Sequence, residues 1–338
     1  MTWQERRTVT ILSTILLILF AALLIVLGIR YRENREEPEQ SGAEGLPGTV
    51  AEEESAYSAL TYSNGSTTLS FSLDETGHWK WSDDLDFPLD EATVLALLQE
   101  LSAWSPQQTL TDADSLENAG LDEPSGGLAA TASDGSVATL LFGKTTTDGT
   151  SYYVRLNGDE STVYIISDAL YKLMCVPIYD MMVLPVLPQL EEDTINTIFV
   201  RAGSTDDAEN LAPITVITAQ HADGGSTTWR YSGANVSDDK LVRDLLEDLT
   251  SLQLDKCVIY RPSDEAAAIC GFDAPDATLS VGYTLENGEE GTLHLTIGNR
   301  LPDGSGRYVR LDDDTTIYLL KTDTLDPLMH ISVNGLDG

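Results

Sequence analysis

The sequence predicts an α+β protein: a single N-terminal transmembrane helix followed by two tandem, homologous, mainly antiparallel β-sheet domains, each with one or two packed helices. Three observations predict it: one uncharged apolar run near the N-terminus, an internal repeat across most of the chain, and short strand-like runs separated by turn dipeptides. Regular strand–helix–strand alternation is missing, so a parallel α/β sheet is not expected. The net charge of −36 over 338 residues excludes a sequence-independent nucleic-acid binder, because phosphate affinity comes from Lys and Arg.

The apolar run covers residues 9–29, VTILSTILLILFAALLIVLGI, and carries no charge. A helix of this length spans the roughly 30 Å hydrocarbon core of a bilayer. No small-residue cleavage pattern of a signal peptide follows it. We therefore expect an uncleaved anchor that contacts the bilayer, a cytoplasmic N-terminus over residues 1–8 and an extracytoplasmic body in the cell membrane. Two arginines precede the run and three follow it, which slightly favours the opposite orientation, but long domains translocate largely regardless of flanking charge.

Residues 30–55 are acidic and contain Gly and Pro, and from residue 33 onward they have few large apolar side chains. This composition is typical of a self-repelling tether. Beyond the tether the sequence repeats once. Gly120–Pro124 matches Gly271–Pro275, and Tyr153–Leu156 recurs identically as Tyr308–Leu311. The matches keep one order along the chain, so we expect two repeat domains, residues 56–190 and 191–338, each near the usual domain size.

Each copy shows the same succession of patterns. A helix with apolar residues at helical spacing is expected from Asp90 and again around Leu241–Leu252, and a short last helix at Asp168–Met174 and Asp323–Met329. Turn dipeptides such as Asp134-Gly135 separate the β-rich runs, as hairpins require. The expected strands are Ala59–Ser63, Thr67–Leu73, Leu128–Ala132, Val137–Phe142, Tyr152–Leu156, Thr162–Ile166, Ile195–Val200, Ile214–Ala219, Thr278–Tyr283, Thr292–Ile297, Arg307–Leu311 and Thr316–Leu320.

The Gly-x-Asp-x-Pro turn, the steps Leu141-Phe142-Gly143 and Thr296-Ile297-Gly298, and the Tyr-Val-Arg strand resemble domain-of-unknown-function family 4340. The resemblance covers both copies. It implies a bacterial, membrane-anchored, extracytoplasmic accessory or interaction protein whose partners are integral membrane subunits of an ABC-2-type transporter of the gliding-motility class. It supplies no catalytic residues.

Signatures of catalysis are absent from the sequence: it has no nucleophile elbow, zinc-protease motif, Walker loop or dinucleotide fingerprint. The four histidines are scattered, and adjacent carboxylates are expected by chance in so acidic a chain. Asp303–Gly306 and Asp312–Asp314 offer oxygen ligands for calcium but lack the spacing of a calcium loop. We therefore predict no catalytic residue, no cofactor and no metal ligand, and expect that the protein is not an enzyme.

Two features are candidates for partner contact. The joint between the copies is unusually apolar and includes Met181, Val183, Leu184 and Leu187. It is either a segment packed between the copies or a surface for a membrane-embedded partner.

The second feature is the pair of repeated arginines, Arg155 and Arg310. Tyr and Arg two positions apart lie on one face of a strand, so a cation–π or ion-pair role and a ligand contact are both open. Cys257 and Cys270 are either a disulfide or two buried thiols.

The leading functional hypothesis is therefore a single-pass accessory subunit of an ABC-type transport system. The alternatives are a binding module for wall polysaccharide or divalent ions, and an uncharacterised envelope hydrolase. Exposed aromatic side chains on one sheet face would favour the polysaccharide module, and a cleft with converging carboxylates would favour the hydrolase.

Overall fold

The computed structural model describes residues 57–112, 118–203, 214–222, 226–285, 287–312, 314–321 and 323–336. The expected anchor at residues 9–29 and the tether at residues 30–55 lie outside this part of the chain. Within it, no helix combines the length and the apolar character needed to cross a bilayer.

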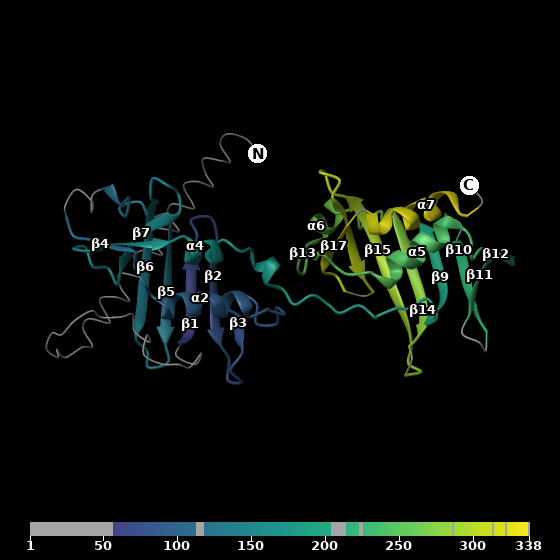
Figure 1. Cartoon of the computed structure of the whole chain (residues 1–338), viewed down its shortest axis with the longest axis horizontal. Coiled ribbons are helices and arrows are strands. Elements are labelled where there is room, and N and C mark those ends of the chain that lie inside the picture. The colour runs from purple at the N-terminus through teal and green to yellow at the C-terminus, as the bar shows by residue number, and fades with distance from the viewer. Residues whose placement is uncertain are drawn as a thin grey trace. The chain divides into compact units, whose positions relative to one another are not determined.

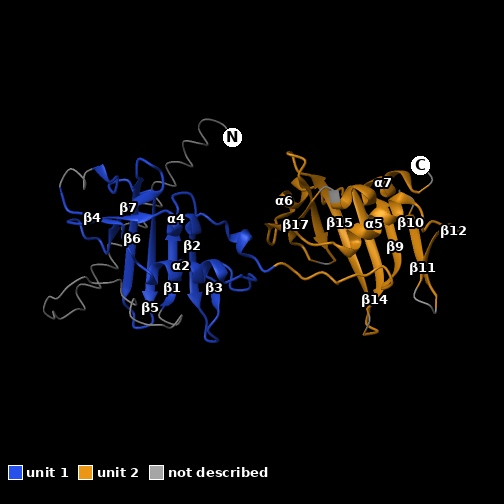
Figure 2. Ribbon diagram, viewed as in Figure 1, with its two compact units in different colours: residues 1–183 blue, residues 184–338 orange. Residues whose placement is uncertain are grey.

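The chain divides between Val183 and Leu184 into two compact units, unit 1 over residues 1–183 and unit 2 over residues 184–338 (Figure 2). The sequence placed this division after residue 190. Each unit contains one antiparallel sheet, of eight strands in unit 1 and nine in unit 2, with a few short helices (Figure 1). The predicted α+β class with antiparallel sheets is confirmed.

Unit 1 has the strand order β3-β2-β1-β5-β6-β7-β8-β4. Its strands are β1 (Tyr57–Ser63), β2 (Thr68–Leu73), β3 (Trp79–Trp81), β4 (Gln108–Leu110), β5 (Gly126–Ala132), β6 (Val137–Thr145), β7 (Ser151–Leu156) and β8 (Val163–Ser167). Its described helices are α2 (Ala92–Ser102), α4 (Ala169–Met174) and the 3-10 turn η2 (Ile178–Met181).

Unit 2 has the order β12-β11-β10-β9-β14-β15-β16-β17-β13. Its strands are β9 (Ile195–Ala202), β10 (Ile214–His221), β11 (Thr227–Tyr231), β12 (Ala234–Asn235), β13 (Lys256–Ile259), β14 (Ala277–Thr284), β15 (Glu290–Arg300), β16 (Gly306–Leu311) and β17 (Ile317–Lys321). Its described helices are α5 (Lys240–Thr250), α6 (Asp264–Ile269), the 3-10 turn η3 (Asp323–Leu325) and α7 (Asp326–Asn334).

The two sheets have one topology, with β12 as an addition at the edge of the second. Strands β1, β5 and β7 correspond to β9, β14 and β16, and the short edge strands β4 and β13 pair antiparallel with β8 and β17. Tyr153 and Tyr308 accordingly lie at the same place in β7 and β16, and Pro124 and Pro275 lie just before β5 and β14. The sequence predicted the long central strands and missed β3, β4, β11, β12, β13 and α6.

The helices α2 and α4 of unit 1 and α5 and α7 of unit 2 pack on one face of their sheet, and the core lies between these helices and the strands. Helix α6 lies on the other side, beside Arg310. In unit 1, Val94 and Leu97 of α2 and Met174 of α4 are fully buried against strand residues such as Leu60 and Leu140. In unit 2, Leu245 of α5 and the α7 residues Leu328 and Ile331 are buried, and α7 packs on β9. The predicted helical residues Trp104 and Leu252 lie just beyond the ends of α2 and α5.

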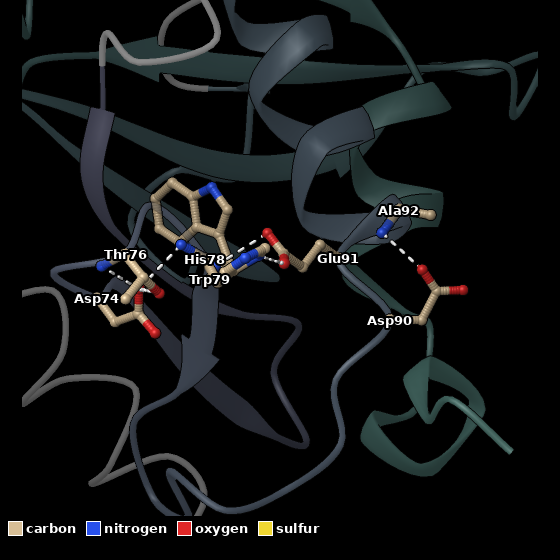
Figure 3. Close-up of polar contacts among 7 residues, drawn as sticks. All are labelled: Asp74, Thr76, His78, Trp79, Asp90, Glu91 and Ala92. Atoms are coloured by element: carbon tan, nitrogen blue, oxygen red, sulfur yellow. Dashed lines mark hydrogen bonds and ion pairs between the residues drawn. The ribbon is translucent and has the colours of Figure 1, made fainter. Parts of the chain in front are cut away.

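In unit 1 a glutamate fastens the edge strand β3 to the start of α2 (Figure 3). The Glu91 carboxylate accepts a hydrogen bond from the backbone N–H of Trp79 at 2.9 Å and contacts Nδ1 of His78 at 2.9 Å. Next to it, Asp90 accepts from the N–H of Ala92 at 3.0 Å, which satisfies one free donor at the helix start. His78 therefore belongs to a surface contact between strand and helix.

A glycine in each unit permits the closest backbone contact of the fold. Gly143 and Gly298 lie at irregularities of β6 and β15, where a Cβ atom would meet the carbonyl oxygen of Ala119 at 2.1 Å or of Cys270 at 2.2 Å. The same carbonyls accept hydrogen bonds from Lys144 and Asn299, each at 2.8 Å. The repeated turn and the repeated glycine thus form one packing contact, used twice.

Candidate functional site

The face of the unit 2 sheet opposite α5 and α7 presents arginine, hydroxyl and apolar side chains and no carboxylate at its central positions, although the chain as a whole is acidic. On β9, Ile198 and Val200 are fully buried in the core, so Phe199 and Arg201 point to the other side. We call this side the outer face of unit 2. Its central positions on five adjacent strands are Ile214, Val216, Phe199, Arg201, Thr278, Ser280, His294, Thr296 and Arg310.

Strand register places two arginines in one row across this face. Arg201 lies opposite Thr278, Thr278 lies opposite Thr296, and Thr296 lies opposite Arg310. Because neighbouring strands are about 4.8 Å apart, the two arginine Cα atoms are separated by about 14 Å. The row therefore offers two cationic ends with two hydroxyl groups between them.

Both arginines keep unused hydrogen-bond donors. Within the described part of the chain, the Nε–H of Arg201 and that of Arg310 are shielded from solvent without a hydrogen-bond partner, and neither guanidinium is in an ion pair. Arg307, by contrast, is paired with Asp276. A buried donor without a partner costs free energy, so a hydrogen bond to either group would be stabilising.

Arg310 stacks on the repeated turn rather than on the tyrosine two positions before it. Its guanidinium carbon lies 4.3 Å from the ring centroid of Phe272, a cation–π distance, which corrects the expected pairing with Tyr308. Partial burial lowers the pKa of the Arg310 guanidinium, whereas the nearby Asp314 carboxylate acts to raise it. The side chain remains a cation held in a fixed direction.

A second row crosses the face two residues along the strands. Phe199 lies opposite Ser280, and Ser280 lies opposite His294, whose Nδ1 is 2.6 Å from the Ser280 hydroxyl oxygen. This Ser–His contact lacks the remaining parts of an acyl-transfer site: the Asp312 carboxylate accepts from the His294 backbone N–H, not from its ring. Phe199 is 40% exposed, and Ile214, which lies opposite Arg201 in the first row, is 45% exposed. The two rows are therefore apolar at the end formed by β9 and β10.

Beside Arg310 lies a hollow of about 380 Å³ between α6 and the turn that carries Phe272. Arg261 lines it together with two carboxylates, Asp264 and Asp273. The hollow therefore has mixed charge, and an anion inside it would be opposed by both aspartates. Arg310 is itself one of the residues that line this hollow, and the Asp314 carboxylate also lies near it, whereas Arg201 is not among the lining residues.

The corresponding face of unit 1 is made of smaller side chains. The row equivalent to Arg201–Arg310 consists of Ser63, Gly127, Leu141 and Arg155. Arg155 also has a shielded Nε–H without a partner among the described residues, but no second arginine faces it. Thr61 occupies the place of Phe199. Unit 1 thus has one cation and no exposed aromatic group where unit 2 has two cations and a phenylalanine.

The other sequence candidates lie in the joint. Met181 is 1% exposed and belongs to the core of unit 1, where the Asp90 N–H donates to its carbonyl at 2.7 Å. Val183 is 54% exposed. Leu184 and Leu187 line a hollow of about 610 Å³ beside residues 250–254 of unit 2. The structure therefore distributes these residues instead of gathering them into one surface.

Cys257 and Cys270 are buried free thiols, 2% and 4% exposed, and burial raises the pKa of Cys270 while Arg310 acts to lower it. Among the described residues no three His, Cys, Asp or Glu side chains gather in a way that could hold a metal ion. The Asp303 carboxylate is used within its own turn, where it accepts from the N–H and hydroxyl of Ser305 at 3.0 and 2.7 Å.

Comparison with known families is decisive at this point. Residues 79–221 and 229–329 match the family described as Domain of unknown function (DUF4340). The chain belongs to this family. No curated protein and no solved structure matches the chain.

The two family matches do not coincide with the two folded units. Each match begins at a tryptophan of corresponding strands, Trp79 of β3 or Trp229 of β11, and the first ends at His221 of β10. The first match therefore includes the hairpin β9–β10, which pairs into the sheet of unit 2. In this chain the boundaries of the family matches are therefore offset from those of the folded units by one hairpin.

Sequence reasoning selected Arg155 and Arg310 because they repeat, and it missed the residues that do not. Arg201, Phe199, Ser280 and His294 come together only through the register of β9, β14 and β15. The signal that could have found them is a difference between the copies: Arg201 stands where unit 1 has Ser63.

Proposed function

We propose that this protein is a membrane-anchored, extracytoplasmic interaction protein that serves an ABC-2-type transport system of the gliding-motility class. The observation that carries the proposal is the outer face of unit 2, where arginines and a phenylalanine are displayed on a chain of net charge −36. Protein interfaces are enriched in arginine and aromatic residues and depleted in Lys, Asp and Glu. The central positions of this face include none of these three residue types.

Two further observations support the proposal. The uncharged run at residues 9–29 has the length of a membrane anchor, and the acidic residues 30–55 provide a tether for the body. The most tightly packed signature residues of the family, Gly143 and Gly298, serve the packing of each unit, so this part of the shared pattern specifies a scaffold. The transporter class comes from the family resemblance.

Co-purification in detergent tests the proposal. A tagged full-length chain isolated from its own membranes should bring the transporter's membrane subunits with it, and protease added to intact protoplasts should remove the body. A chain that is protected from protease, or that purifies without any transporter subunit, would contradict the proposal.

A wall-polysaccharide module is the second candidate, because Phe199 is an exposed aromatic ring on a sheet face. Aromatic rings on flat faces stack on sugars through their apolar surfaces. Sedimentation of the purified protein with isolated cell walls, compared with that of a Phe199→Thr variant, separates this candidate from the first. Loss of sedimentation in the variant would favour the polysaccharide module.

A further inference from the structure

We propose that the outer face of unit 2 binds a short acidic segment of a protein partner, with carboxylates of that segment bound to Arg201 and Arg310. The inference rests on the proposed function and names the chemistry of the partner. It is argued from the charge, the composition and the size of this face.

Charge gives the sign of the ligand. Arg201 and Arg310 have no ion-pair partner within the described part of the chain, although acidic residues outnumber basic ones by 55 to 19. Each also has a shielded Nε–H that no described acceptor satisfies. A guanidinium group binds a carboxylate through two parallel hydrogen bonds, so an acidic side chain satisfies the charge of each arginine.

Composition identifies the ligand as a protein segment. The apolar side chains Ile214, Val216 and Phe199 lie next to Arg201, and Ile214 and Phe199 are 45% and 40% exposed. Apolar and aromatic anchors beside arginine are the composition of energetically important residues in protein interfaces. A bare phosphate polymer has no apolar groups to cover them.

Size indicates a short segment. Five strands about 4.8 Å apart and two rows about 6.6 Å apart give a face of roughly 300 Å², below the roughly 800 Å² that each partner buries in a typical protein complex. The separation of about 14 Å between the arginines equals about four residues of extended chain at 3.3 Å per residue. The segment that fits crosses the strands with acidic residues four positions apart, and it has an apolar residue just beyond the acid that binds Arg201, where Ile214 lies.

The test uses the purified full-length chain in detergent micelles and fluorescence anisotropy. The probe is a labelled serine-rich peptide with two glutamates four positions apart and a leucine two positions outside each of them, so that a leucine reaches Ile214 in either chain direction. Its control has glutamine in place of both glutamates. The protein variants are Arg201→Gln with Arg310→Gln, and the matched control Arg230→Gln. Arg230 is also on the sheet, but its donors already bind Gln220 and the Gly233 carbonyl.

We expect the glutamate peptide to bind and the glutamine peptide to bind at least about tenfold more weakly. The double variant should lose about tenfold in affinity, as two partly exposed ion pairs predict, while Arg230→Gln should bind like the unaltered chain. Added salt should weaken binding of the unaltered chain, which tests the ionic contribution even if the double variant does not fold.

Four results would overturn the inference. Equal binding of both peptides would show that the carboxylates do not contribute to binding. Equal binding by the double variant and the unaltered chain would show that the two arginines do not contribute. Tighter binding of inorganic polyphosphate than of the glutamate peptide would assign the face to a phosphate polymer. Self-association that disappears in the double variant would assign it to a second copy of this chain. Co-purification with the transporter in any of these cases would leave the proposed function standing.

Discussion

The two units of this protein share one sheet topology but differ on the sheet face opposite the core. Unit 1 displays Ser63 and Thr61 at the places where unit 2 displays Arg201 and Phe199. The buried positions of the sheet and the glycine–turn contact are common to both units, whereas the outward residues at these two places differ. The comparison teaches that the repeat preserves a scaffold, and that one copy carries the residues suited to a partner.

The largest effect should come from the shared glycine contact. Gly143→Ala and Gly298→Ala each bring a Cβ to within 2.1 or 2.2 Å of a backbone carbonyl oxygen, so each should destabilise its own unit by about 4 kcal/mol. Gly135→Ala is the control, because its Cβ meets nothing and only the positive φ of +84° opposes it, at about 1 kcal/mol. Urea unfolding measures the three values. If the loss of unfolding free energy for Gly143→Ala and Gly298→Ala is no larger than for Gly135→Ala, the glycine–turn contact does not stabilise both units.

The next effect separates the core part of the joint from its exposed part. Met181→Ala removes a side chain that is 1% exposed in unit 1 and should cost about 3 kcal/mol. Val183→Ala, two residues later and 54% exposed, should change the free energy of unfolding by less than about 0.5 kcal/mol. Thermal unfolding of the two variants checks the difference. Equal losses of stability would show that Met181 and Val183 are packed to the same extent.

A buried tyrosine in each unit sharpens the comparison further. The Tyr318 hydroxyl donates to the Asp314 carboxylate at 2.7 Å, so Tyr318→Phe should cost about 1.5 kcal/mol. The Tyr62 hydroxyl is buried and has no described partner, so Tyr62→Phe should be neutral or slightly stabilising. Denaturant unfolding of both variants tests this. A larger loss for Tyr62→Phe would contradict the assignment of its hydroxyl.

The smallest effect is the response to alkaline pH. Burial raises the pKa of Tyr62 and of Tyr318, and the Asp314 hydrogen bond adds to the shift of Tyr318. Because the folded pKa lies above the unfolded value of about 10, the stabilising contribution is complete below pH 10 and is lost as pH rises above it, by about 1 kcal/mol per tyrosine at pH 11. The free energy of unfolding, measured between pH 8 and 11, should fall by this amount above pH 10, and the fall should be smaller in each Phe variant. An unchanged slope would contradict it.

Much of the fold could be predicted because its strands are long and its repeat is visible. Runs such as Val137–Phe142 alternate clearly, and the repeated Tyr-Val-Arg strand aligns the two copies. The strand β4, with three residues, was missed because it is too short to show a period, and its pairing with β8 joins distant parts of the chain. The helix α6 was missed for the same reason of length.

The candidate site could be predicted only in part, because it depends on register. Arg310 was found from its repetition, but its neighbours on the outer face come from four strands separated by loops and helices. A shift of one residue in β9 would turn Arg201 toward the core and Val200 outward. Periodicity within a strand does not report that alignment, so Arg201, Phe199 and His294 had to be seen in the folded sheet.

Site-specific photo-crosslinking in intact cells tests the central claim that unit 2, and not unit 1, contacts the partner. Phe199→p-benzoylphenylalanine and Thr61→p-benzoylphenylalanine place the same reactive group at equivalent positions of the two sheets. The proposed function predicts an adduct with a transporter membrane subunit, identified by mass spectrometry, at position 199 and not at position 61. Adducts with the same subunit from both positions, or none from position 199, would contradict the account.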